Sequence, residues 1–102
     1  MEKTTIPPQL LADVKNNLNI TWEDQSTDAK ISGLILQAMA YLNNKGGDIL
    51  DYEQAGYPRL LLMEFVRYAR DEALDVFENN YLSLILAMQN ERRVMAYVES
   101  TE

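Results

Sequence analysis

A run of apolar residues at helical spacing, between Tyr57 and Met88, constrains the fold of this chain more than any other feature. After Pro58, apolar side chains recur mostly at intervals of three and four residues, which places them on one face of an α-helix. A second apolar row widens that face, so we expect the helix to be covered from more than one side. Asn79 and Asn80 interrupt the pattern, which then resumes on an expected returning helix. The first face comprises Leu62, Val66, Ala69, Ala73, Val76 and Phe77, the second row Leu61, Phe65 and Tyr68, and the returning helix Tyr81, Leu84, Ile85 and Met88.

A short amphipathic helix is expected near the N-terminus. Pro8 suits its first turn, where the missing N–H costs nothing. Residues 1–6 have no period and predict a loose start. Trp22, the only tryptophan, is expected to cover one end of the core, because aromatic side chains dominate core burial. The apolar face of this helix comprises Leu11, Val14 and Leu18.

The most regular helical stripe lies between residues 28 and 42. Ser26 or Thr27 can cap its N-terminus, and Gly46-Gly47 can supply the left-handed cap at its end. Residues 48–56 then cross between the two halves of the chain. The stripe comprises Ile31, Leu34, Ile35, Ala38 and Leu42, and the linker residues expected to reach the core are Ile49, Leu50 and Tyr52.

Together these patterns predict an all-α fold, a small bundle of four main helices. A length of 102 residues fits one domain. We expect the bundle to occupy residues 1–91. Residues 92–102 are expected to form a flexible C-terminal tail that becomes ordered on a partner, because no helical stripe is left for them to join.

Composition excludes several classes of function. The chain has no cysteine and no histidine, so a disulfide framework, a thiolate metal site and the commonest general base are all absent. A formal net charge of −7 weighs against wrapping nucleic-acid phosphates. No secretory signal or membrane span is expected, because the longest apolar cluster is closed by Glu64.

No motif in the chain predicts catalysis, and we expect no catalytic residue, no cofactor and no metal. The acidic stretch Asp48-x-x-Asp51-x-Glu53 does not have the calcium-loop spacing, so a solvated acidic loop explains it better. The serines have no histidine to activate them. The chain is therefore not expected to be an enzyme.

One basic feature remains. Arg92-Arg93 is the only adjacent basic pair in this acidic chain, and an apolar segment follows it directly. The pair suits charge compensation at the end of a helix. It equally suits docking on a partner, and the sequence leaves both alternatives open.

The order of these features resembles the head–tail connector family of tailed bacteriophages, in particular its head completion (adaptor) proteins. The resemblance covers about residues 10–90. Each motif is a core spacing or a turn, so the likeness lies in their order and in the total length. The motifs are Leu10-Leu11-Ala12-Asp13-Val14-Lys15-x-x-Leu18-x-Ile20, then Asp28-x-x-Ile31-x-x-Leu34-Ile35-x-x-Ala38-x-x-Tyr41-Leu42, Tyr57-Pro58, Phe65-Val66-x-Tyr68-x-Arg70, Glu78-Asn79-Asn80-Tyr81 and Leu84-Ile85-x-x-Met88.

The resemblance implies a structural role in the virion. Such proteins assemble as a ring of about a dozen copies beneath the portal protein at the capsid vertex, having been made in the host cytoplasm. They extend the channel through which double-stranded DNA passes, and they carry a stopper or tail-completion protein. Family members dock on the portal through a C-terminal segment. In this chain that segment corresponds to Arg92, Arg93, Val94, Met95, Tyr97 and Val98.

A channel that passes DNA without binding it should expose acidic rather than basic side chains. With 16 acidic and 9 basic residues, this chain can present such a wall. The sequence does not decide between two sets of candidates. They are Asp48, Asp51 and Glu53 in the linker, or Asp71, Glu72 and Asp75 in the second half.

Two other functions compete with the connector. The first is a small helical adaptor or regulatory module that binds a single protein partner. The second, a helix-turn-helix DNA binder, is disfavoured because the chain is acidic and has no basic recognition helix.

Overall fold

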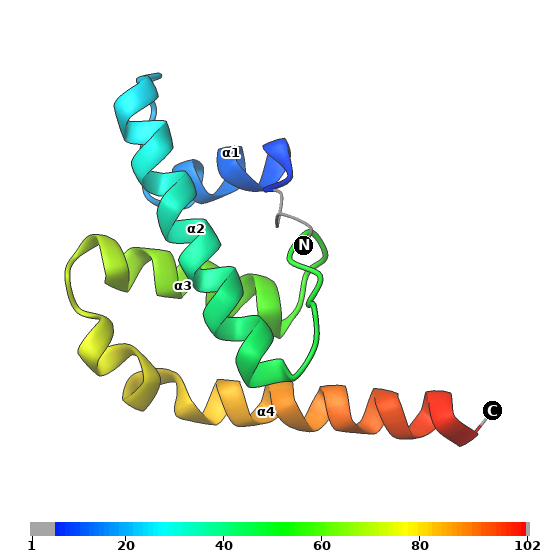
Figure 1. Cartoon of the computed structure of the whole chain (residues 1–102). Coiled ribbons are helices and arrows are strands. Elements are labelled where there is room, and N and C mark those ends of the chain that lie inside the picture. The colour runs from blue at the N-terminus through cyan, green and yellow to red at the C-terminus, as the bar shows by residue number, and fades with distance from the viewer. Residues whose placement is uncertain (1–5, 102) are drawn as a thin grey trace.

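Four α-helices make up the part of the chain that the structure, a computed structural model, describes: residues 6–101 (Figure 1). No strand occurs within that range, so the all-α class expected from the sequence is confirmed. Except for Ile6, the loose start expected for residues 1–6 lies outside the described residues. The helices are α1 (Pro8–Asn17), α2 (Gln25–Gly46), α3 (Tyr57–Arg70) and α4 (Leu74–Thr101).

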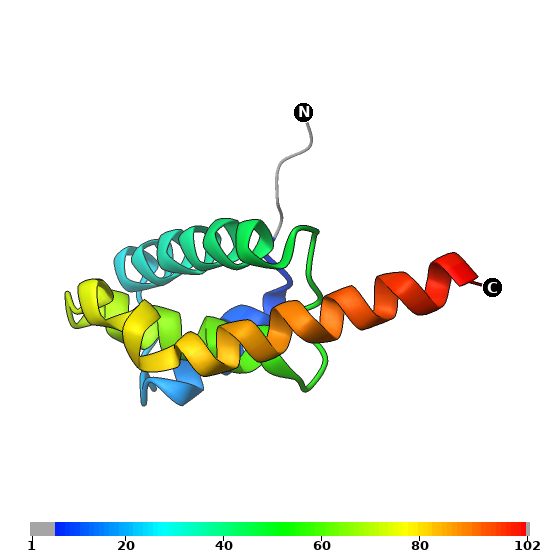
Figure 2. The ribbon, with the colours of Figure 1, turned by 90° about the horizontal axis from the view of Figure 1, so that it is seen from below.

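Helices α2 and α3 form the centre of the bundle. α3 packs against both α2 and α4, while α1 packs against α2 and α3. Helix α4 runs along the edge of the bundle, and its C-terminal half extends past the other helices (Figures 1 and 2). One half of α4 is therefore part of the bundle and the other half is not.

The core is formed largely by the apolar faces that the sequence predicted, although α1 buries Leu10 and Val14 and leaves Leu11 and Leu18 only partly buried. Leu62 and Val66 from the first predicted face and Ile85 from the returning helix are buried in one cluster. Leu34 is only half-buried, and its neighbour Ile35 takes the buried position instead. Every buried residue among those described is apolar or aromatic.

Five aromatic rings from three helices meet around Phe77, which is 1% exposed. Its ring centroid lies 5.2 Å from that of Tyr81, 5.3 Å from Phe65, 5.7 Å from Tyr68 and 6.0 Å from Tyr41. Three of these four pairs have the edge-to-face arrangement that aromatic rings prefer. Because Tyr41 comes from α2, and Phe65 and Tyr68 from α3, this cluster fixes the start of α4 against both.

The break between the last two helices is not at Asn79–Asn80, where the sequence predicted it. Helix α3 ends at Arg70, and α4 begins at Leu74. Glu72 takes a left-handed conformation, with φ of 57°, and the Ala73 N–H donates to the Tyr68 carbonyl at 2.8 Å. A turn without glycine or proline interrupts the helix while the apolar period continues across it. The prediction was therefore wrong, and Val76, expected in the core, is exposed.

The N-terminus of α2 is capped by Asp24 rather than by Ser26 or Thr27. The Asp24 carboxylate accepts hydrogen bonds from the Thr27 N–H at 3.1 Å and from the Thr27 hydroxyl at 2.8 Å. These bonds favour the ionised form and lower the pKa of Asp24. At the other end, Gly47 adopts the expected left-handed cap, with φ of 76°.

The linker after α2 reaches the core through two of the three expected residues. Leu50 and Tyr52 are buried, whereas Ile49 is almost wholly exposed. The Asn43 side-chain oxygen accepts from the Leu50 N–H at 3.0 Å and from the Tyr52 hydroxyl at 2.6 Å, so it ties the linker to α2. Trp22, expected to cover the core, is instead half exposed in the turn before α2.

Candidate functional site

The segment expected to be a tail continues α4 as a regular helix to Thr101. The helix is not broken there because the segment contains neither glycine nor proline and includes helix-forming side chains such as Arg92, Met95 and Ala96. The division expected between residues 91 and 92 thus falls inside a helix. We call residues 92–101 the projecting end of α4.

The projecting end exposes an unusual amount of apolar surface. Met88 is the last buried residue of α4, and the helix continues for roughly 20 Å beyond it at about 1.5 Å per residue. Val94, Met95, Tyr97 and Val98 are between 46% and 70% exposed. Four large apolar side chains on ten residues of helix are typical of an interaction surface.

The two arginines of the basic pair have different surroundings. The Arg92 guanidinium lies 3.1 Å from the Asp48 carboxylate, and this ion pair fastens α4 to the start of the linker. Its Nε atom is buried and has no hydrogen-bond partner. Arg93 is exposed. The structure therefore places Arg92 at the base of the projecting end, where it contacts the bundle, and leaves Arg93 accessible.

The two sets of candidate channel acids lie in different parts of the molecule. Asp48 pairs with Arg92, near the C-terminal end of α4. Asp75 lies in the first turn of α4, 17 residues before Arg92 and so about 25 Å from it along the helix. Within the linker, Asp51 accepts a hydrogen bond from the Glu53 N–H at 2.9 Å. Asp71 is the C-cap residue of α3, and Glu72 follows it in the turn. Asp48 and Asp75 are thus associated with opposite ends of α4, and the hydrogen bond between Asp51 and the Glu53 N–H is the contact recorded within the linker set.

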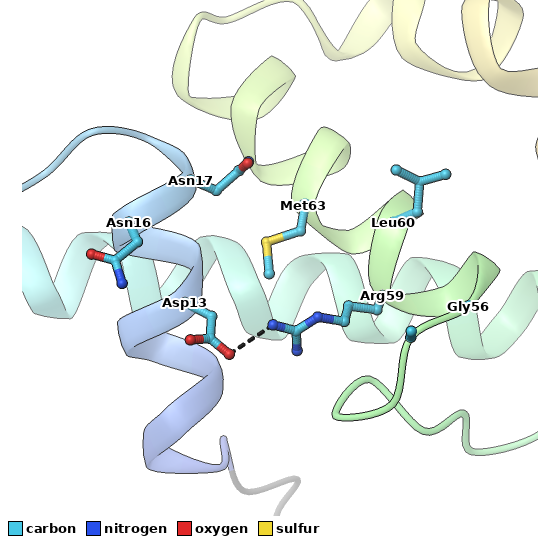
Figure 3. Close-up of a pocket in the computed structure, with 8 residues that line it drawn as sticks. Asp13, Asn16, Asn17, Gly56, Arg59, Leu60 and Met63 are labelled. Carbon is cyan, nitrogen blue, oxygen red and sulfur yellow. Dashed lines mark hydrogen bonds and ion pairs between the residues drawn. The ribbon is translucent and has the colours of Figure 1, made fainter.

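A groove between α1 and the start of α3, missed by the sequence analysis, is the largest cavity described, with a volume of about 620 Å³ (Figure 3). Arg59 reaches across it to Asp13, 2.6 Å away, and also donates to the Tyr52 carbonyl at 3.1 Å. The hydrogen bond from Arg59 lowers the pKa of Asp13. Asp13 and Arg59 are 46 residues apart in the chain, so no local sequence motif could predict this ion pair. Arg59 therefore joins the start of α3 to α1 and to the linker.

A second polar contact joins α2 to α4 beside the aromatic cluster. The Tyr41 hydroxyl donates to Glu78 at 2.5 Å, and Lys45 lies 2.7 Å from the same carboxylate oxygen. The pKa of Glu78 is lowered, mainly by the Lys45 hydrogen bond, and burial raises the pKa of Tyr41. This contact therefore ties α2 to the start of α4 beside the aromatic cluster.

Within residues 6–101, no group of three or more histidine, cysteine, aspartate or glutamate side chains is arranged to hold a metal ion. None of the helices in that range combines the length and the apolar character needed to cross a membrane. Comparison with protein-family models, with curated proteins and with solved structures finds no match to this chain.

Proposed function

We propose that this chain is a head–tail connector (head completion) protein of a tailed bacteriophage. In this proposal it forms a ring beneath the portal protein at the capsid vertex, extends the DNA channel, and carries the stopper or tail-completion protein. The proposal is supported by the order of motifs that the chain shares with that family and by the projecting end of α4.

The projecting end carries the proposal because it fits the docking role. A helix that lays apolar side chains into a groove on its partner is a recurrent mode of recognition. Five of the six residues implied in docking, from Arg93 to Val98, lie on the exposed part of this helix, while Arg92 holds its base. A short helix binds weakly alone. A ring of about a dozen copies would engage the portal at many points, so its avidity would far exceed that of one copy.

The test is assembly on portal rings purified from the same phage. Removing residues 94–102 keeps Arg92 and Arg93, and none of the deleted residues whose burial the structure describes, 94–99, is buried. We expect the truncated protein to keep its thermal midpoint and helical content, apart from the deleted turns, and to lose attachment to the portal. Electron microscopy and co-sedimentation would measure this.

A matched control is Trp22→Ala, which removes a large exposed side chain far from α4 along the chain and should leave attachment unchanged. Attachment of the truncated protein would place the docking site elsewhere. Binding of one copy to a single different protein, with no ring on the portal, would favour the adaptor or regulatory module instead.

The channel part of the proposal predicts that the isolated protein does not retain duplex DNA. Its net charge of −7 opposes binding, and at physiological salt only charges within about 8 Å of a phosphate act strongly. Fluorescence anisotropy with labelled duplex should show no saturable binding at 0.15 M salt. Tight, salt-sensitive binding would contradict an acidic channel wall and favour a DNA-binding function.

A further inference from the structure

Helix α4 has a second exposed apolar surface, on the side turned away from the bundle. Its inner face buries Phe77, Ile85 and Met88. On the outer side, Val76, Leu82, Leu86 and Val94 are 43–53% exposed. At 3.6 residues per turn these four side chains fall within about one third of the helix circumference. We call this surface the outer face of α4.

Charge is distributed unevenly along this outer face. Asp75 lies near its N-terminal end, where Asp71 and Glu72 in the preceding turn add further negative charge. Arg93 lies near its C-terminal end and on the same side as Asp75, because 18 residues make five full turns. A second copy of the helix, turned end for end, would therefore bring Arg93 to Asp75 at both ends of the contact.

We propose that two copies of the chain pair through this outer face, with their α4 helices antiparallel. Setting Leu82 level with Leu86 of the second copy also sets Asp75 level with Arg93 of the second copy. In the same register, Val76 of one copy lies within two residues of the level of Val94 of the second copy. Asn79 of one copy likewise lies within one residue of the level of Asn90 of the second copy. Each contact occurs twice, because the same surface is used by both copies around a two-fold axis.

The pairing is self-complementary in three respects. Four leucines meet at the centre, the two valine pairs flank them, and opposite charges lie at both ends. A parallel arrangement in register would place Asp75 on Asp75 and Arg93 on Arg93, and like charges repel at this distance. The contact spans roughly 30 Å of helix, with few apolar side chains. It is therefore smaller than a standard protein interface, and the dimer should depend on concentration.

This inference does not rest on the proposed function. It does bear on it, because Val94 belongs both to the outer face and to the projecting end. A copy paired in this way would hold part of its docking surface against the other copy. Pairing and portal docking would then compete, and assembly on the portal would release the pair.

The first test is the mass of the full chain in solution. Analytical ultracentrifugation over a concentration series should show a species of twice 11.7 kDa that dissociates on dilution. Leu86→Glu should raise the dissociation constant ~100-fold or more, since both symmetry-related leucine contacts are lost. Leu36→Glu, at an exposed position on α2, is the matched control and should leave the dimer intact. A protein that stays monomeric at every concentration would overturn the proposal.

The second test uses the charges to fix the orientation. Asp75→Arg and Arg93→Asp should each weaken the dimer, by about tenfold or more. The double variant should regain it, because the exchanged charges face each other again in the antiparallel pair. If the double variant is no better than either single one, the antiparallel register is wrong.

Covalent trapping provides a third readout, on a background free of native cysteine. A chain carrying both Asn79→Cys and Asn90→Cys should form a disulfide-linked dimer under mild oxidation. A chain with Asn79→Cys alone should not, since residue 79 meets residue 90 and not itself. Efficient cross-linking of the single variant would show a parallel pair and contradict the inference.

The Leu86→Glu variant also separates this proposal from that of portal docking. The substitution changes no residue of the projecting end, so the variant should still attach to portal rings although it no longer forms the dimer.

Discussion

Phe77→Ala should lower the free energy of unfolding by about 3–5 kcal/mol. The ring is 1% exposed and stands between four other aromatic rings, from α2, α3 and α4. Its removal leaves a cavity that rigid neighbouring rings fill poorly, and it also removes the edge-to-face contacts. Chemical denaturation followed by circular dichroism would measure the loss.

Two further variants separate the causes of this loss. Phe77→Leu keeps most of the apolar volume, so its cost of about 1 kcal/mol or more would come largely from the lost ring contacts. Val76→Ala, at the adjacent exposed position, should change stability by less than about 0.5 kcal/mol when measured at concentrations where the monomer prevails. A Phe77→Ala variant as stable as the parent would mean that α4 does not pack on α2 and α3 through this ring.

Leu62→Ala should cost roughly 2–5 kcal/mol of unfolding free energy. Leu62 is fully buried at the middle of α3, a helix that contacts each of the other three. A cavity at this position is bordered by several helices at once, and such a site collapses poorly. The thermal midpoint should fall by roughly 4–8 °C for each kcal/mol lost, as is usual for a domain of this size.

Leu60→Ala is a close control for this prediction. It makes the same deletion two residues away on the same helix, at a position that is 44% exposed. Its effect should stay within about 0.5 kcal/mol. Equal effects of the two substitutions, or an unchanged midpoint for Leu62→Ala, would show that the other face of α3 is turned inward.

The parts of the fold that depend on helical period could be predicted from the sequence. The stripe through Ile31, Ile35, Ala38 and Leu42 and the row through Leu61 and Phe65 are buried as expected. These faces are regular because each packs on a continuous surface, so a spacing of three and four residues is preserved along them.

The turn between α3 and α4 could not be predicted, because the sequence carries no signal for it. It uses Glu72 in a left-handed conformation, which is uncommon for a side chain of that kind. Ala69, Ala73 and Phe77 recur at intervals of four residues across this turn. The pattern therefore indicated a helix that continues past Arg70. Asn79 and Asn80, which looked like the break, are instead exposed positions inside α4.

The residues of the candidate docking site were proposed from the sequence, but their helical conformation was not predicted. Arg92 to Val98 were chosen for their apolar and basic character, and a disordered tail was expected because their side chains extend no stripe. In the structure the helix continues through residues 93–99, which are all exposed, on backbone hydrogen bonding and helix propensity. The long-range pairs Arg92–Asp48 and Arg59–Asp13 join residues 44 and 46 positions apart, and no local pattern reveals such contacts.

Met88 is the last buried residue of α4, although the helix continues beyond it. The two parts of this one continuous helix therefore differ in their local stability. Up to Met88 the helix opens only when the bundle unfolds. Beyond Arg92 the side chains whose burial the structure describes, residues 93–99, are all exposed, and a stretch of that length is marginal as an isolated helix in water. A partner that recognises the helical form therefore selects one state of a local helix–coil equilibrium. Its apparent affinity is reduced by the fraction of time that the end is coiled. Substitutions that raise helix propensity at solvent-facing positions there would tighten binding without adding any contact to the partner.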